Sequence, residues 1–280
     1  MSFPAALHVL ARPAPTPDAP TAILVHGSLD KAESFRRVIR RLPEMATVAY
    51  DRRGYAGSRQ GGVVDLGGHA DDLLTMVASI RADGARGPVV AVGHSLGGDV
   101  VVAAALAEPR AFDAVGAFEP PMPWLGFRRT QPVSTGDGSS GTAAPAAATG
   151  GWLAMADDPA EEAQRFFSRM VSPESWDRLS EDGRNERRAD GPALVADLRS
   201  FRTESMPFDV TALAVPSVFG MGGPTSQPHH RRTVEWLGTH VPGGESMEID
   251  GAQHGAHLSH PDHFAAFVRR VVARAGDGTG

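Results

Sequence analysis

The sequence contains no cysteine and few aromatic residues, which account for 6% of its 280 positions. Without cysteine, the chain can form no disulfide bridge, no thiol nucleophile and no metal or iron–sulfur site with thiolate ligands. Any catalytic chemistry must therefore use oxygen and nitrogen groups.

Positive charge is also scarce, because 27 lysine and arginine residues face 33 aspartate and glutamate residues, for a net charge of -6. This balance argues against a basic surface that binds nucleic acid. The sequence has no run of 18 apolar residues, and its N-terminus lacks a basic segment followed by an apolar one. We therefore expect no nucleic acid partner, no membrane span and a cytoplasmic protein.

Short apolar runs rich in valine and isoleucine alternate with longer segments of helical period, a pattern typical of parallel β-α units. Several runs are apolar at successive positions, as strands covered on both faces require. The predicted fold is α/β, with a doubly wound, mostly parallel sheet and a helical lid insertion. The predicted strands are 21–25, 46–50, 88–92, 114–118, 216–219 and 245–249; the predicted helices are 31–41, 69–81, 96–107, 227–237 and 261–273, with 159–170 and 192–201 in the insertion.

The regular alternation is interrupted between the fourth and fifth predicted strands. We predict that residues 1–120 and 207–280 form the core and that residues 121–206 form a lid or cap. Within the insertion, residues 130–151 consist mainly of glycine, serine, threonine, alanine and proline, with one charge and no large apolar side chain. Such a segment buries too little surface to offset the entropy of ordering, so we expect a flexible linker.

The segment 93–98, with the sequence GHSLGG, lies between an apolar strand and a helix rich in alanine and valine. A serine at such a strand-turn-helix corner has a strained backbone and an exposed hydroxyl group. Ser95 is therefore the candidate nucleophile. The backbone N–H of Leu96 begins the helix, where the positive helix end stabilises a developing oxyanion.

In this context the chain resembles the α/β-hydrolase superfamily, particularly its capped serine esterase and lipase-like members. The resemblance extends over nearly the whole chain except residues 130–151. His26-Gly27-Ser28 follows a predicted strand and is similar to the His-Gly turn of that family. The resemblance implies that the Ser28 N–H is the second oxyanion donor, with Leu29 as the near alternative. Residues 51–58, DRRGYAGS, also resemble a family turn, which we interpret as structural.

A serine hydroxyl needs a base near neutral pH, and histidine is the usual one. His254 lies between the last predicted strand and the final helix, where the family carries its catalytic histidine. His257, His260 and His263 recur every three residues, which suggests a metal site. A proline interrupts their common face and no carboxylate set accompanies them, so we expect no metal and no other cofactor.

The position of the acid departs from the commonest family pattern. No aspartate or glutamate lies between Val215 and Val234, where the family usually has its acid. Glu119 ends the strand that follows the nucleophile unit, and some relatives use an acid at this strand end. We predict Glu119 as the triad acid and keep Asp250 as the alternative.

The predicted function is a serine hydrolase that cleaves a small carboxylic ester or thioester through an acyl-enzyme. Its small-molecule substrate carries an apolar group, and candidate binding residues are Leu29, His94, Met122 and Trp124. Other serine chemistries of the superfamily remain open: carbon–carbon bond hydrolysis, acyl transfer and cofactor-free peroxidation. A ligand-binding homologue without activity is the alternative from a different class. The sequence leaves the oligomeric state open.

Overall fold

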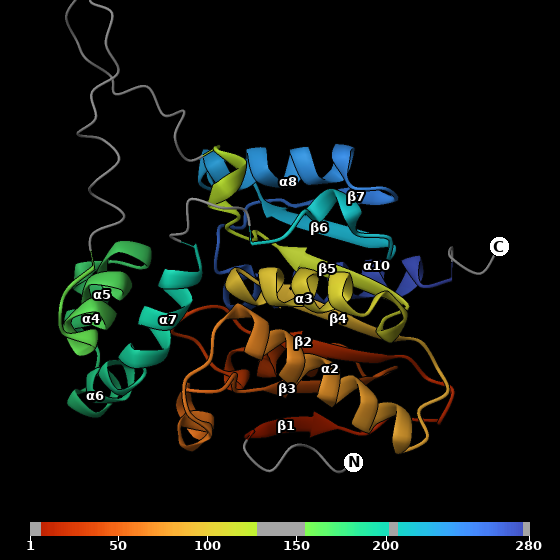
Figure 1. Cartoon of the computed structure of the whole chain (residues 1–280), viewed down its shortest axis with the longest axis horizontal. Helices are drawn as coiled ribbons and strands as arrows, with labels where there is room; N and C mark the ends of the chain where they lie inside the picture. The colour runs from red at the N-terminus through yellow and green to blue at the C-terminus, as the bar shows by residue number, and fades with distance from the viewer. Residues whose placement is uncertain (1–6, 128–154, 202–206, 277–280) are drawn as a thin grey trace, which may run out of the picture.

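The computed structural model describes residues 7–127, 155–201 and 207–276 of the chain (Figure 1). Their centre is a seven-stranded sheet with the order β1-β3-β2-β4-β5-β6-β7. Every neighbouring pair is parallel except β1 with β3, which is antiparallel. This arrangement confirms the predicted mostly parallel α/β sheet. The strands are β1 (Val9–Arg12), β2 (Thr21–Val25), β3 (Ala46–Tyr50), β4 (Val89–His94), β5 (Ala114–Phe118), β6 (Ser217–Gly222) and β7 (Gly244–Ile249).

Helices cover both faces of the sheet. Side chains of α2, α3 and α8 form one apolar core with the sheet, and side chains of α1 and α10 form a second core on the opposite face. The helices are α1 (Arg36–Ile39), α2 (Leu66–Ala82), α3 (Leu96–Ala107), α4 (Pro159–Met170), α5 (Pro173–Asp177), α6 (Glu181–Ala189), α7 (Gly191–Phe201), α8 (Pro228–His240), α9 (Ala256–Ser259) and α10 (Pro261–Arg274).

Strand β2 illustrates why these runs are apolar at every position. Ile23 and Val25 belong to the first core, whereas Ala22 and Leu24 belong to the second. Successive side chains of a strand point to opposite faces, so a strand with two covered faces must be apolar throughout. The doubly wound arrangement thus follows from the continuous apolar runs.

Several predicted boundaries differ from the structure. Strand β1 was not predicted, because its four residues are short and only partly buried. The segment predicted as one helix at 31–41 is instead a 3-10 helix, Ala32–Phe35, followed by the single turn α1. Helix α2 begins three residues before the predicted position 69, because the Asp65 side chain caps it by accepting a hydrogen bond from the Gly68 N–H.

Helices α4 to α7 lie between β5 and β6 in the chain and form a separate group beside the sheet (Figure 1). Ala163, Leu194 and Leu198 form a small apolar cluster within this group. Helix α4 begins at the predicted Pro159 and includes the predicted apolar face up to Met170, and α7 begins one residue early. Helices α5 and α6 were not predicted, because their sequences contain little apolar periodicity. The predicted linker 130–151 lies outside the described residues.

No helix in the described part of the chain combines the length and the hydrophobicity needed to cross a membrane.

Candidate active site

Ser95 lies on the sharp turn between β4 and α3, with φ 52° and ψ -128°. Neighbouring glycines permit this turn. A Cβ atom on Gly93 would lie 2.0 Å from the Gly97 carbonyl oxygen, and one on Gly97 would lie 2.1 Å from the Val25 carbonyl oxygen. Backbone strain of this kind persists only where the surrounding structure enforces it, and it is typical of functional sites. The strained turn leaves the Ser95 side chain partly exposed.

Glu119 leaves the sheet beside Ser95. The register pairs His94 of β4 with Phe118 of β5, so the next residue of each strand begins a loop at the same edge. His254, from the loop between β7 and α9, reaches this edge as well. Its Nδ1 lies 2.8 Å from Oε2 of Glu119. Three segments that are distant in sequence thus bring the predicted nucleophile, base and acid to one end of the sheet.

The Glu119 carboxylate is fully buried but well hydrogen-bonded. Its Oε1 accepts hydrogen bonds from the Gly222 N–H, at 2.8 Å, and from the Ser226 hydroxyl group. Burial disfavours the charged form, but the hydrogen bonds from His254, Ser226 and Gly222 outweigh it and lower the pKa of Glu119. The carboxylate is therefore ionised at neutral pH and accepts a hydrogen bond from the His254 Nδ1–H.

Ser226 was not identified from the sequence, because a serine in the loop after β6 carries no pattern of its own. The resemblance placed the usual acid in this loop, and in the structure the loop supplies a hydrogen-bond donor to Glu119, the predicted acid. Asp250, the alternative acid, is exposed just after β7, and His254 pairs with Glu119.

A cavity of about 370 Å³ lies over these groups. Ser28, Ser95 and His254 line it. Its volume falls within the range typical of small-molecule sites. The apolar part of its lining comes mainly from the helical insertion and from the loop after β5: Phe166, Met170, Leu198, Pro121 and Pro123.

Four residues predicted to contact substrate, Leu29, His94, Met122 and Trp124, are not among the described residues that line this cavity. Met122 is buried in the core beneath the loop, and Trp124 packs against the same core. Leu29 packs against the apolar cluster of the helical insertion. Closeness in sequence to Ser95 or Glu119 was therefore not a reliable guide to the residues that line the cavity.

The predicted oxyanion donors lie on both sides of Ser95. Leu96 is the first residue of α3, where backbone N–H groups have no partner within the helix. The Gly27–Ser28 backbone approaches the nucleophile closely, since a Cβ atom on Gly27 would lie 2.9 Å from Cβ of Ser95. Ser28 itself lines the cavity. Both N–H groups thus belong to backbone adjacent to the nucleophile.

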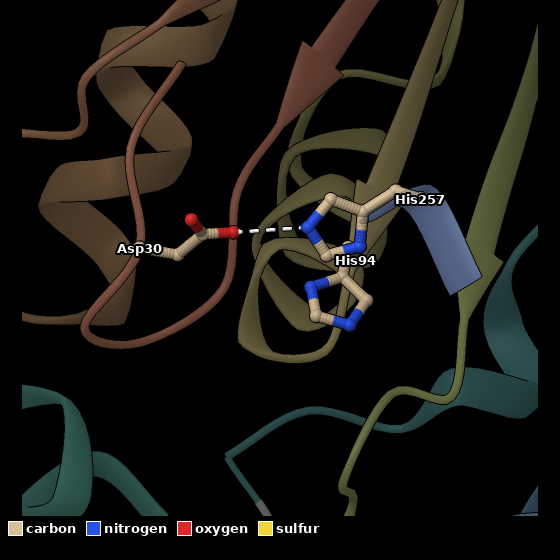
Figure 2. A group of neighbouring side chains, drawn as sticks. All are labelled: Asp30, His94 and His257. Carbon is tan, nitrogen blue, oxygen red and sulfur yellow. Dashed lines mark ion pairs between the residues drawn. The ribbon is translucent and has the colours of Figure 1, made fainter. Parts of the chain in front are cut away.

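His94, drawn in Figure 2 with Asp30 and His257, contacts the loop that carries His254. Its Nε2 lies 2.7 Å from the His254 carbonyl oxygen, and because a carbonyl only accepts, His94 donates from Nε2. Burial, followed by repulsion from His257 and His254, holds the pKa of His94 well below its usual value, so the ring is neutral. His94 therefore fixes the backbone of the loop that carries His254.

His257 stacks on His94, with ring centroids 4.2 Å apart, and its Nε2 lies 3.3 Å from Oδ2 of Asp30. Figure 2 shows this pair beside His94. Burial opposes ionisation of Asp30, but the His257 side chain more than offsets it and lowers the pKa of the carboxyl group. The sequence did not predict the contact between Asp30 and His257, because the loop of Asp30 and helix α9 come together only in the folded chain.

Two groups of described side chains could offer three ligand atoms to a metal ion, Asp30 with His94 and His257, and Glu119 with His230 and His254. In each group the carboxylate lies close to one histidine: 3.3 Å for Asp30 with His257 and 2.8 Å for Glu119 with His254. His230 stacks on His254, with ring planes 15° apart. Neither arrangement requires an ion.

The turn 51–58 has the structural function predicted for it. The Asp51 carboxylate accepts hydrogen bonds from the Ala32 N–H, at 2.7 Å, and from the Gly57 N–H, at 2.9 Å. Asp51 thus joins the loop after β3 to the loop after β2, which carries Ser28.

Comparison with known proteins agrees with this geometry. Residues 17–128 match the family described as serine aminopeptidase, S33. Lipase LipV from Mycobacterium tuberculosis is 29% identical over 154 residues, which cover 53% of this chain and 57% of the lipase. The matched region thus spans little more than half the length of that relative.

Solved structures resemble the chain over almost its full length. A thermophilic esterase from Thermogutta terrifontis superposes with a TM-score of 0.63 at 17% identity, covering 96% of this chain and 93% of the esterase. An α/β hydrolase from Sphaerobacter thermophilus gives a TM-score of 0.63 at 16% identity, covering 93% and 95%. At these identities the superpositions establish the fold alone. Together with the strand order, they show that the chain has the α/β-hydrolase fold, and the family match covers residues 17–128 of it.

Proposed function

We propose that the protein is a serine hydrolase that cleaves small carboxylic esters or thioesters through an acyl-enzyme. One observation carries this proposal: Ser95, on a strained turn, and His254, hydrogen-bonded at 2.8 Å to a buried carboxylate, line the same cavity. A nucleophile, a base and a group that orients the base are the elements of Ser-His-acid catalysis.

The proposed mechanism begins with His254. Because the Nδ1–H donates a hydrogen bond to Glu119, Nε2 is the unprotonated nitrogen of the neutral ring and can take the hydroxyl proton of Ser95. Ser95 Oγ then attacks the substrate carbonyl carbon, and the Ser28 and Leu96 N–H groups stabilise the negative oxygen. His254 returns the proton to the leaving group. Water, activated by His254, then hydrolyses the acyl-enzyme.

The Glu119 charge contributes in the transition state, when His254 becomes a cation. A buried carboxylate in direct contact stabilises that cation and holds the ring in the productive tautomer. The ligand-binding alternative depended on a missing acid, so the contact between Glu119 and His254 favours catalysis over it.

The cavity lining supports a substrate with an apolar acyl or alcohol group. Phe166, Met170 and Leu198 come from the helical insertion, and contact with them removes apolar substrate surface from water. The insertion would then act as a cap that selects for apolar groups.

The test of this proposal is whether Ser95 is an activated serine. A fluorophosphonate probe should label the folded protein stoichiometrically, and the Ser95→Ala variant should neither be labelled nor hydrolyse p-nitrophenyl esters. Its thermal unfolding should match that of the parent, because the Ser95 side chain is only partly buried. Full turnover by Ser95→Ala would exclude the proposed mechanism.

A further inference from the structure

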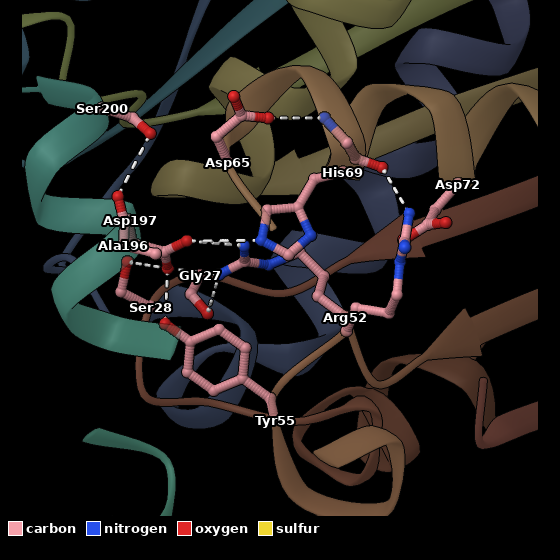
Figure 3. A network of polar contacts seen from close by, with 12 residues as sticks. Gly27, Ser28, Arg52, Tyr55, Asp65, His69, Asp72, Ala196, Asp197 and Ser200 are labelled. Atoms are coloured by element: carbon pink, nitrogen blue, oxygen red, sulfur yellow. Dashed lines mark hydrogen bonds and ion pairs between the residues drawn. The ribbon is translucent and has the colours of Figure 1, made fainter. Parts of the chain in front are cut away.

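Asp197, on α7 of the helical insertion, carries a carboxylate that is only 1% exposed. Its oxygens accept hydrogen bonds from both terminal nitrogens of Arg52, at 3.1 and 2.8 Å. The hydroxyl groups of Ser28, at 2.8 Å, and Tyr55 donate to the same oxygen, Oδ2 (Figure 3). His69 Nε2 lies 3.4 Å from the other oxygen. One residue of the insertion is thus bound to three segments of the core.

The charges in this network are stably paired. Burial opposes ionisation of Asp197, but the charge of Arg52 and hydrogen bonds from His69 and Arg52 lower its pKa below the usual range. Burial, followed by repulsion from Arg52, lowers the pKa of His69, which favours a neutral ring. The charged part of the network is therefore a single ion pair between Asp197 and Arg52, and both side chains are buried.

Arg52 also holds the loop that approaches Ser95. Its Nε donates to the His26 carbonyl oxygen at 3.0 Å, and its Nη2 donates to the Gly27 carbonyl oxygen at 3.1 Å. The Gly27 carbonyl oxygen accepts a second hydrogen bond, from His26 Nδ1 at 2.7 Å. The same guanidinium group therefore contacts both Asp197 and the backbone of this turn.

These contacts determine the direction of one N–H group. In a trans peptide the C=O and the following N–H point to opposite sides. Because the Gly27 carbonyl points toward Arg52, the Ser28 N–H must point away from Arg52. Gly27 lies against Ser95, and Ser28 lines the cavity, so the opposite side of this peptide is the side of the nucleophile.

We propose that Asp197 is a positioning residue, which acts through Arg52 and the Ser28 hydroxyl to hold the Gly27–Ser28 peptide with its N–H toward the substrate oxyanion. The inference depends on the proposed function, and it extends that function by giving the helical insertion a part in transition-state stabilisation. The insertion then both lines the cavity and fixes one of the two donors.

The experiment compares two hydroxyl groups on the same oxygen of Asp197. Substitution of Asp197 itself would leave Arg52 buried without a counter-charge and could unfold the protein, so the variants are Ser28→Ala and Tyr55→Phe. Each removes one hydrogen bond to Oδ2, but only Ser28 belongs to the peptide next to the nucleophile. Tyr55→Phe keeps the ring that contacts His26 and Arg52.

With p-nitrophenyl butyrate, Ser28→Ala should lower kcat about tenfold, the effect of roughly one hydrogen bond, with KM nearly unchanged. An alkylboronic acid, which forms a tetrahedral adduct with the serine, should bind Ser28→Ala about tenfold more weakly. Tyr55→Phe should keep the kcat and the boronic acid affinity of the parent. This should hold even if both variants lower the melting temperature equally.

Fluorophosphonate labelling of Ser95 in the parent distinguishes failure of the positioning role of Asp197 from failure of the proposed function. A labelled, active parent with an unchanged kcat in Ser28→Ala, or with equal losses of kcat in both variants, overturns the positioning role and leaves the proposed function intact. A folded parent that is neither labelled nor active overturns both.

Discussion

Two buried carboxylates lie on either side of Ser95, and they hold different kinds of partner. Glu119 comes from the core and binds His254, whose side chain is 22% exposed and lines the cavity. Asp197 comes from the helical insertion and binds Arg52, whose side chain is fully buried. A histidine can gain and lose a proton near neutral pH, whereas an arginine remains charged. Glu119 is therefore suited to a charge that appears during the reaction, and Asp197 to a permanent ion pair.

Substitution of the two carboxylates should also affect the stability of the fold to different extents. The Oε1 atom of Glu119 accepts hydrogen bonds from a backbone N–H and a hydroxyl group, and a glutamine oxygen at this position could accept both. Arg52 has no other carboxylate among its described hydrogen-bond acceptors. We therefore expect substitution at Glu119 to affect mainly catalysis and substitution at Asp197 to affect mainly stability.

The largest expected effect is on kcat in Glu119→Gln. The amide cannot stabilise the His254 cation, so kcat for p-nitrophenyl butyrate should fall by about 10³- to 10⁴-fold, with little change in KM. Steady-state kinetics measure both. The control is Asp250→Asn, which alters an exposed carboxylate and should retain parental kcat. A larger loss in the control would reassign the acid to Asp250.

The second effect is on the stability of Asp197→Asn. The substitution leaves the Arg52 charge buried without a counter-charge, which typically costs about 3 to 5 kcal/mol of unfolding free energy. Urea unfolding measures it. The matched control is Asp190→Asn in the same insertion, whose partner Arg59 is 32% exposed. Although the Asp190 carboxylate is only 7% exposed, water can solvate the partly exposed Arg59 when its partner is neutral, so the control should lose about 1 kcal/mol or less. Equal losses would contradict the special role of the Arg52 pair.

The third effect concerns acid, which should weaken the contact between His26 and Arg52 well before it protonates Glu119. His26 accepts a hydrogen bond from the Arg52 N–H, and burial together with the Arg52 charge lowers its pKa to about 4. The unfolded chain binds this proton below about pH 6.5, but the folded chain does not until about pH 4. The contribution of His26 to the free energy of unfolding is therefore largest above pH 6.5 and decreases as the pH falls toward 4.

Between about pH 7.5 and pH 5, His26 alone should reduce the unfolding free energy by about 2 kcal/mol. Glu119 has a lowered pKa, so its contribution is complete above the unfolded value of about 4.3 and declines only below it. Urea unfolding at the two pH values tests this. His26→Gln should flatten the pH dependence, whereas exchange of the exposed His263 by glutamine should not. An unchanged slope in His26→Gln would contradict the assignment.

The sequence by itself determined the elements with strong local signals. Continuous apolar runs require strands covered on both faces, and the glycines beside Ser95 require a turn too tight for a Cβ atom. The absence of an acid after β6 directed attention to Glu119, because parallel strands end at the same edge of a sheet. The prediction of Ser95 follows from these local patterns, whereas the predictions of His254 and Glu119 also depend on the resemblance to the α/β-hydrolase superfamily.

Only the tertiary structure decided which residues line the cavity and which support it. His94 and Met122 are near the nucleophile and the acid in sequence, yet both are buried outside the described cavity lining. Ser226 binds Glu119 across 107 residues, and Asp197 binds Arg52 across 145. Such pairs leave no periodic pattern, because each contact depends on the packing of whole elements rather than on neighbours along the chain.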